Sequence, residues 1–325
     1  MSHLLEYIDI NEFKCFKNFH AEGFKRVNLI GGKNNVGKTA FMEACYINIY
    51  SRDIETTTHA ITRVTYRRKN LEFLGKPYGT SYAKIFLEKV NGISISSKLN
   101  SLKFHIKKHE GVEEYIFNIG NNAKKIIVNV NEFSFREEYL ENIEFIDNFG
   151  LTNSELKDSY ESIQKKEKEE LVNKYINEFD NNILNFKILG GNNPACKALN
   201  IDDYQDINEF GDGLKHYLSI ICLLYACENG YLFIDEIDKG IHYTQLDRLW
   251  EIILTISKDQ NVQVLATTHS RECIESYARV SKKLEDEDIS FIELGRDKEN
   301  KIQANVLDFY KFNKEIANGN GVRGW

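Results

Sequence analysis

Hydrophobic and polar positions along the chain follow several distinct patterns. A short apolar run at residues 27–30, bounded by glycines, predicts a buried strand, and residues 40–50 predict a helix with a broad apolar face. Residues 231–234 and 262–267 predict two more buried strands. Apolar strands of this kind are typical of parallel sheets covered on both faces. These segments therefore predict an α/β core.

The middle of the chain has a different pattern. From residue 82 to 130, apolar and polar residues alternate between turn signals such as Asn91-Gly92 and Asn121-Asn122, which predicts an antiparallel β-meander. A helix is expected next, opened by a capping box from Thr152 to Glu155 and continuing to Phe179. Its charged stretch, residues 165–170, is interpreted as a solvated helix face rather than an interaction tip.

Composition places the chain among ordinary soluble proteins. It has 325 residues, of which 42% are hydrophobic and 28% charged, which suits one core domain with an insertion. The longest nearly apolar run, residues 218–227, is too short to cross a bilayer, and no targeting segment is visible, so we expect a cytoplasmic protein without membrane contact. The six cysteines form no C-x-x-C pair, which favours reduced, buried thiols.

The segment between the first strand and helix carries the strongest chemical signal. It fits a phosphate-binding P-loop at every fixed position, and its context, strand then helix, is the one this motif requires. We expect the glycines and backbone N–H groups to wrap the phosphates of ATP, Lys38 to reach the β/γ-phosphates, and the Thr39 hydroxyl to bind Mg²⁺. The alternative is a glycine turn that happens to precede a lysine. The predicted nucleotide-binding residues are Gly32, Lys33, Asn34, Asn35, Val36, Gly37, Lys38, Thr39 and Ala40.

Two carboxylates follow the predicted strand 231–234. A buried parallel strand delivers the residues after it to the sheet edge where open α/β sheets bind ligands. We expect Asp235 to hold Mg²⁺, mostly through water, and Glu236 to orient and activate the attacking water. The alternative for this pair alone is a solvated acidic turn.

A histidine follows the predicted strand 262–267. His269 comes just after Thr267-Thr268, at the same edge of the sheet, where it could bond the γ-phosphate or the attacking water. Lone histidines are usually structural, but the predicted place of this one favours a sensor of nucleotide state. Lys38, Glu236 and His269 are thus the predicted catalytic residues.

As a set, these motifs resemble the ABC-type ATPase heads of the OLD (overcoming lysogenization defect) and SMC/RecF group. The resemblance rests on residues 32–39, 233–242 and 266–270, and on the opening segment 7–19. It implies an α/β fold, a P-loop NTPase of ABC-ATPase type with an antiparallel β-meander and a helical insertion. The expected division is an N-terminal ATPase half (1–80), the meander (81–135), the helical insertion (136–190) and a C-terminal ATPase half (191–325).

The sequence departs from that group in two places. Heads of this class carry a serine-glycine signature that caps the γ-phosphate of an opposite subunit, whereas here Phe210 stands where serine is expected. Gly211 and Gly213 can still offer N–H donors at a helix N-terminus, and the alternative is a loop that merely starts the helix 214–227. No glutamine occurs between Thr39 and Ser162, so the glutamine loop is absent or substituted. Both departures predict slow turnover.

Charge and length bear on the partners. The net charge of −7 argues against general electrostatic binding of duplex DNA. A local cluster of Arg63, Arg67, Arg68 and Lys69 could meet a phosphate backbone, an acidic partner or the nucleotide, or be a solvated basic face. The acidic run 285–288 is interpreted as a solvated turn, and the 56 residues after His269 are too few for the Toprim nuclease domain that many members of the group carry.

These observations support a regulatory ATPase as the leading hypothesis. It would assemble as a homodimer or higher oligomer through its heads and control a separate effector protein, a nuclease or a toxin, in antiviral defence. The defence role comes from the resemblance alone. The second hypothesis is a RecF-like ATPase of DNA repair that binds nucleic acid directly, and the third is the nucleotide-binding subunit of a transporter.

Overall fold

A mainly parallel sheet forms the centre of the molecule. The structure is a computed structural model that describes residues 4–73, 87, 90, 92–109, 112–129, 138–147, 150–191 and 193–319. The central sheet has the order β15-β14-β3-β13-β12-β8, and only β15 runs antiparallel to its neighbour. Its strands are β3 (Val27–Gly32), β8 (Ile143–Ile146), β12 (Tyr231–Ile234), β13 (Gln263–Thr267), β14 (Ile289–Arg296) and β15 (Ile302–Asp308). The three strands expected from the apolar runs are confirmed, and their carboxyl ends share one edge.

An antiparallel sheet forms a second layer. Its order is β2-β1-β4-β5-β6-β7, so the meander does not stand apart but extends the N-terminal hairpin, with Asp9 of β1 paired to Ser96 of β4. The sheet-forming alternation predicted for residues 102–106 and 115–119 is confirmed. The strands are β1 (Tyr7–Phe13), β2 (Phe16–Glu22), β4 (Gly92–Ser96), β5 (Ser101–His109), β6 (Val112–Ile119) and β7 (Asn122–Asn129).

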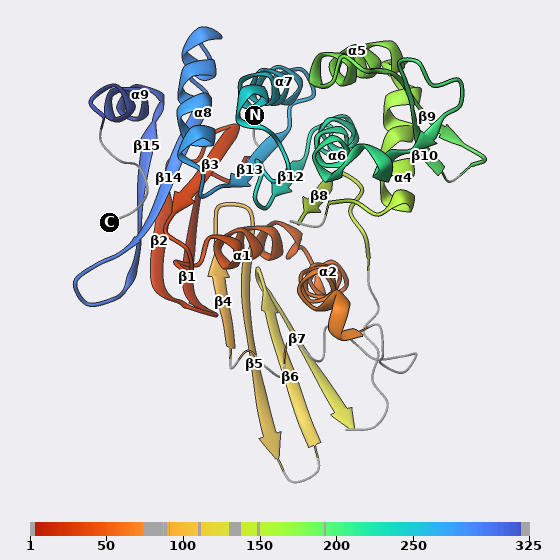
Figure 1. Ribbon diagram of the computed structural model, residues 1–325. Coiled ribbons are helices and arrows are strands. Elements are labelled where there is room, and N and C mark those ends of the chain that lie inside the picture. Colours follow the sequence, from red (N-terminus) through yellow and green to blue (C-terminus); the bar gives the residue numbers. More distant parts are fainter. Residues whose placement is uncertain are drawn as a thin grey trace.

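Helices cover both faces of the central sheet (Figure 1). Leu232 and Ile234 of β12 pack in one buried cluster and Phe233 between them packs in another, because successive residues of a strand point to opposite faces. The first cluster lies under α6 (Asp212–Ala226), α7 (Leu246–Asp259), α8 (Arg271–Lys283) and α9 (Phe309–Ala317). The second lies under α1 (Lys38–Tyr50), which α2 (Ile54–Phe73) follows.

Helix α1 lies between the two sheets, with the central sheet on one side and β4 to β7 on the other (Figure 1). Every residue from Ala40 to Tyr50 is buried, including Glu43 and Asn48. The helix is therefore buried around its whole circumference, and not only on the apolar face that the sequence predicts. A helix enclosed between two sheets holds the P-loop at its N-terminus in a fixed position.

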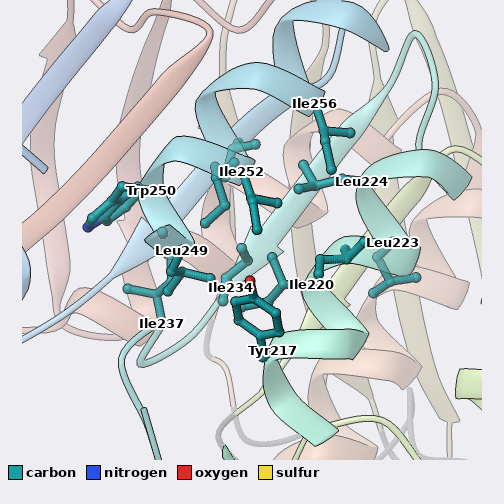
Figure 2. Close-up of a cluster of buried hydrophobic side chains, with 14 of the residues drawn as sticks. Tyr217, Ile220, Leu223, Leu224, Ile234, Ile237, Leu249, Trp250, Ile252 and Ile256 are labelled. Carbon is teal, nitrogen blue, oxygen red and sulfur yellow. The ribbon is translucent and has the colours of Figure 1, made fainter. Parts of the chain in front are cut away.

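The cluster between α6, α7 and β12 is shown in Figure 2. Tyr217 of α6 lies beside Ile234 of β12, Leu224 of α6 lies beside Ile256 of α7, and Trp250 of α7 packs at the edge of the cluster. The Trp250 indole N–H donates to the carbonyl of Cys273 at 3.2 Å, so the one polar atom of that ring is satisfied. This cluster fixes α6 against the strand that carries Asp235.

The helical insertion differs from its prediction. The capping box at Thr152 and Glu155 is confirmed, but the expected single helix is two, α4 (Asn153–Lys165) and α5 (Glu169–Phe179). The break falls in the charged run, where Glu167 adopts a left-handed φ of 53°. Since that run has no apolar residue to bury, packing does not hold it helical.

A small sheet follows the helical insertion and leads into the 3-10 turn Ile207–Phe210. Its order is β11-β10-β9, and its strands are β9 (Ile183–Leu189), β10 (Asn193–Ala198) and β11 (Gln205–Asp206).

Two further interpretations need correction. Asp286 is not part of a solvated turn, because it is 8% exposed and pairs with the buried guanidinium of Arg26. Arg63 is not on a free basic face, since it bonds Glu144 at 3.7 Å and Glu155 at 3.1 Å. The side chains of Arg67, Arg68 and Lys69 lie outside the described residues.

The remaining composition-based expectations concern thiols and membranes. In the described residues, which include all six cysteines, no disulfide forms; five cysteines are buried, whereas Cys15 is exposed. Among the described residues, no helix is both long enough and apolar enough to span a bilayer.

Candidate nucleotide site

The P-loop connects β3 to α1 through backbone that only glycine adopts easily. Gly37 has φ of 109° at the N-cap of α1, and Gly32 has φ of 144°. A β-carbon at Gly32 would also lie 2.5 Å from the carbonyl oxygen of Leu294. The loop therefore packs tightly on β14 and turns sharply into the helix. Residues 33–36 lie between these two glycines, as the sequence predicted.

Lys38 folds back over the loop. Its ammonium donates to the carbonyl oxygens of Gly32 at 2.8 Å and Lys33 at 3.2 Å. Burial lowers the pKa of Lys38, and the nearby carboxylates of Asp235 and Glu236 oppose that shift. A partly desolvated ammonium held over a phosphate-binding loop is placed to exchange its carbonyl partners for phosphate oxygens.

Asp235 meets Thr39 across the site. The Thr39 hydroxyl lies 3.0 Å from Asp235 Oδ2, and the Thr267 hydroxyl donates to Oδ1 at 2.6 Å. Burial raises the pKa of Asp235, the two threonine hydrogen bonds lower it, and Glu236 raises it further. A hydroxyl and a carboxylate held together are hard oxygen donors of the kind that Mg²⁺ prefers.

Glu236 has a constrained backbone. Its φ is 54°, a left-handed conformation that costs roughly 1–2 kcal/mol for a residue with a side chain. Its N–H donates to the Thr267 hydroxyl at 2.9 Å, and the N–H of Ile237 donates to the Thr267 carbonyl at 3.0 Å. Thr267 thus holds both acidic residues, although the sequence analysis gave it no role. Its position at the end of the strand next to β12 was the available signal.

His269 lies at the same edge but is exposed. The residue before it, Thr268, is buried and donates to Asp238 Oδ1 at 2.7 Å. In the described residues, no hydrogen bond joins the His269 ring to Asp235 or Glu236. Within the part of the chain that the structure describes, His269 is therefore brought to the site's edge without engaging the two carboxylates.

The two signature glycines have different environments. Gly211, the N-cap of α6, is exposed with φ of 87°, and a β-carbon there would meet no atom within 4 Å. Gly213 is buried, and a β-carbon there would lie 2.0 Å from the carbonyl oxygen of Gly240. Phe210 packs partly buried against the core. Of the two predicted donors, only Gly211 opens toward solvent.

The turn between β1 and β2 also reaches the site. Lys14 forms an ion pair with Glu43 of α1, whose side chain is 3% exposed. A β-carbon at Gly37 would lie 3.0 Å from the Cys15 sulfur, so this turn rests directly on the P-loop. Sequence reasoning noted the segment only as part of the resemblance, because nothing in its pattern indicates which helix it contacts.

Comparisons with known proteins identify ATPases that are similar to this chain. A family model described as an AAA ATPase domain matches residues 116–274, which include β12 and β13 but not the P-loop. An ATP/GTP phosphatase of Helicobacter pylori is 26% identical over 325 residues, covering 84% of this chain and 87% of that protein. The chain is a P-loop ATPase.

Solved structures show which ATPase fold it is. A structure described as the SMC head bound to the C-winged helix domain of ScpA has a TM-score of 0.53 at 12% identity, covering 95% of this ATPase and 99% of that chain. An Smc head with an extended coiled coil, bound to the C-terminal domain of ScpA derived from Pyrococcus furiosus, has a TM-score of 0.52 at 11% identity. The match covers 98% of this chain and 99% of that chain. At these identities the likeness shows the fold, which is that of an ABC-type P-loop NTPase.

Proposed function

We propose that this ATPase is a nucleotide-operated regulatory module in which two copies pair around ATP and thereby control a separate effector. The observation that carries the proposal is the exposure of Gly211 at the N-terminus of α6. Backbone N–H groups at a helix start attract anions, and a β-carbon at this exposed glycine would meet no atom within 4 Å. A second copy would supply the phosphate that it caps.

Mg²⁺ fits the same site. Thr39 and Asp235 would hold it, because their oxygens already meet at 3.0 Å and Asp235 has a desolvated carboxylate that a cation would offset. When bound, the ion neutralises charge that develops on the phosphate oxygens. Lys38 would bind the β/γ-phosphates, and Glu236, held by Thr267, would orient the attacking water. His269, exposed at the edge, would contact the γ-phosphate once the second copy has closed the site.

The effector role is supported by the resemblance to the OLD group, in which such heads act in antiviral defence. We propose a nuclease or a toxin as the effector. The alternative function, a RecF-like or SMC-like ATPase that binds DNA in repair, is favoured by the overall likeness to SMC heads. The two proposals differ in what stimulates hydrolysis, since the second requires duplex DNA to raise the ATPase rate of the purified protein.

Light scattering tests the pairing. Glu236→Gln should bind ATP without hydrolysing it, so ATP should raise its mass from one copy toward two, while ADP should not. Lys38→Ala is the matched control, because it keeps the same surface but loses the phosphate contact. If the molecular mass of Glu236→Gln does not change when ATP is added, whether the protein is one copy or two, ATP does not drive pairing.

Comparative co-purification tests the effector. Glu236→Gln and Lys38→Ala represent the ATP-bound and nucleotide-free states, so an effector controlled by the cycle should be enriched with one variant and not with the other. A protein recovered equally with both would not be under nucleotide control. ATP hydrolysis that rises with added duplex DNA would favour the repair function instead.

A further inference from the structure

A cavity of about 450 Å³ lies away from the nucleotide site, between α2, α4, the C-terminal end of α6 and residues 139–144. Leu151, Leu223 and Ala226 form its apolar lining. About 18 Å of helix separates Leu223 from Gly211 at the other end of α6, at 1.5 Å per residue. The volume falls in the range of small-molecule sites in proteins.

The charged side chains of the cavity are unbalanced. Four carboxylates line it against two basic groups. Arg63 is already engaged by Glu144 and Glu155, at 3.7 and 3.1 Å. Lys165 lines the cavity too, but its side chain is 76% exposed and lies 3.8 Å from Glu161, which is not a lining residue. Among the described residues, Arg63 thus pairs with two of the four carboxylates, Glu144 and Glu155, and not with the other two.

Two of the carboxylates are available to a ligand. Glu141 and Asp158 both line the cavity, and among the described residues neither side chain makes a hydrogen bond or an ion pair. Beside them stands Tyr139, whose ring is edge-on to His59 with centroids 5.5 Å apart and whose residue is 46% exposed. Its hydroxyl is held by Glu144, which fixes the ring in place.

We propose that this cavity binds a small organic cation that carries ammonium or guanidinium groups on a short hydrocarbon chain. Glu141 and Asp158 accept hydrogen bonds from the cationic groups, which are strengthened because both acceptors are charged. Tyr139 offers an aromatic face to a cation. Leu151, Leu223 and Ala226 cover the hydrocarbon part, so each portion of such a ligand meets matching chemistry.

The segment that forms one wall of the cavity contacts the far end of the P-loop helix and also Asp235. Tyr50, at the end of α1, donates its hydroxyl to the carbonyls of Leu140 at 3.1 Å and Ile143 at 3.2 Å. At the other end of the same segment, the carbonyl of Ile146 accepts from the N–H of Asp235 at 2.8 Å. A ligand that shifts residues 139–146 would therefore act on the P-loop helix and on Asp235. This regulatory effect rests on the proposed function.

Calorimetric titration of the nucleotide-free full chain tests the binding. The probes are agmatine, which has a guanidinium and an ammonium group, and 1,4-diaminobutane, with 1,4-butanediol as the uncharged molecule of equal length. Both amines should bind saturably at physiological salt, and the diol should not. Asp158→Asn should weaken amine binding by about tenfold or more, the loss expected for one charge-assisted hydrogen bond.

Glu170→Gln is the matched control, because it removes one exposed carboxylate on α5 outside the cavity lining. It should leave amine affinity unchanged, and Glu141→Gln combined with Asp158→Asn should abolish binding. Absence of saturable binding by either amine, or equal affinity in Asp158→Asn and the unaltered chain, would overturn the inference. Because the readout is binding without nucleotide, failure here is distinct from failure of ATP-driven pairing.

Discussion

The backbone of Gly213 lies against that of Gly240, so that a β-carbon at Gly213 would be 2.0 Å from the Gly240 carbonyl oxygen. Gly213 belongs to the first turn of α6, and Gly240 lies a few residues after the acidic pair Asp235-Glu236 that follows β12. Gly240 also has φ of 71°, which favours glycine. The helix start that carries Gly211 and the turn that carries Glu236 are thus packed as one unit within a single chain.

This contact predicts that the two glycine-to-alanine variants lose stability for different reasons. Gly213→Ala must displace backbone, so it should destabilise the fold by roughly 1–3 kcal/mol, as overpacking does. Gly211→Ala meets open space, and its cost is the backbone strain of an alanine at φ 87° and ψ 160°, which is roughly 1–3 kcal/mol. Chemical denaturation of each variant against the unaltered chain measures both losses. A Gly213→Ala protein as stable as the unaltered chain would mean that the Gly213–Gly240 contact relaxes without cost.

Asp235 gives a prediction for pH. A carboxyl whose folded pKa is raised contributes stability below its unfolded pKa, and this contribution is lost as pH rises through the folded pKa. Burial raises the pKa of Asp235, so its ionised form destabilises the nucleotide-free protein at neutral pH. Asp235→Asn should therefore melt at a higher temperature than the unaltered chain at neutral pH.

Acidification toward about pH 4 should narrow the difference in melting temperature between Asp235→Asn and the unaltered chain, because an ordinary aspartate takes up its proton near that pH. Asp212→Asn, which alters an exposed acid at the start of α6, serves as the control and should show no such trend. A melting temperature of Asp235→Asn below that of the unaltered chain at neutral pH would contradict the assignment.

Thr267 is predicted to act through its hydroxyl. Thr267→Val keeps the shape but leaves the partly buried N–H of Glu236 without its acceptor and removes one hydrogen bond from Asp235. The expected cost is about 1–3 kcal/mol of stability. Because both acidic residues lose a positioning contact, kcat for ATP should fall more than the KM changes. Thr267→Ser should restore both stability and kcat, and a failure of serine to do so would assign Thr267 a packing role only.

Buried and exposed ion pairs should differ in their contribution to stability. Arg26 is 3% exposed and bonds Asp286, and its Nη1 donates to the Leu254 carbonyl at 3.1 Å. Arg26→Ala leaves a buried carboxylate without its partner, which should cost about 3–5 kcal/mol. Arg279→Ala removes an exposed pair with Asp247 and should cost at most about 1 kcal/mol. Denaturant titrations compare the two, and a mild effect of Arg26→Ala would mean that water reaches Asp286.

The sequence predicted the strands and the helix around the candidate nucleotide site because the P-loop and the acidic strand end have local signatures. Residues 27–39 carry glycines, an apolar strand and a lysine within one short stretch, and residues 231–236 carry an apolar strand followed by two acids. Short-range patterns of this kind are set by backbone geometry, so they can be read without knowledge of distant contacts.

Features that depend on distant contacts were not predictable. The Lys14–Glu43 pair and the burial of Asp286 under Arg26 join residues far apart in the chain, and neither acid differs in sequence from an exposed one. Strand β8 carries a short apolar pattern in a region expected to be helical, and only pairing with β12 shows that it belongs to the central sheet. Thr267 was passed over because a threonine in a strand is ordinary.

The most direct test of the account compares nucleotide binding with hydrolysis in two variants. In the proposed mechanism, Lys38 contacts the phosphates in the ground state, whereas Glu236 acts on the attacking water. Calorimetry with Mg-ATP and phosphate release should show that Lys38→Ala loses tight binding, and that Glu236→Gln binds ATP as the unaltered chain does but releases phosphate at least about a hundredfold more slowly, as loss of a general base does. Equal loss of binding in both variants, or unchanged phosphate release by Glu236→Gln, would contradict the assignment of the two residues.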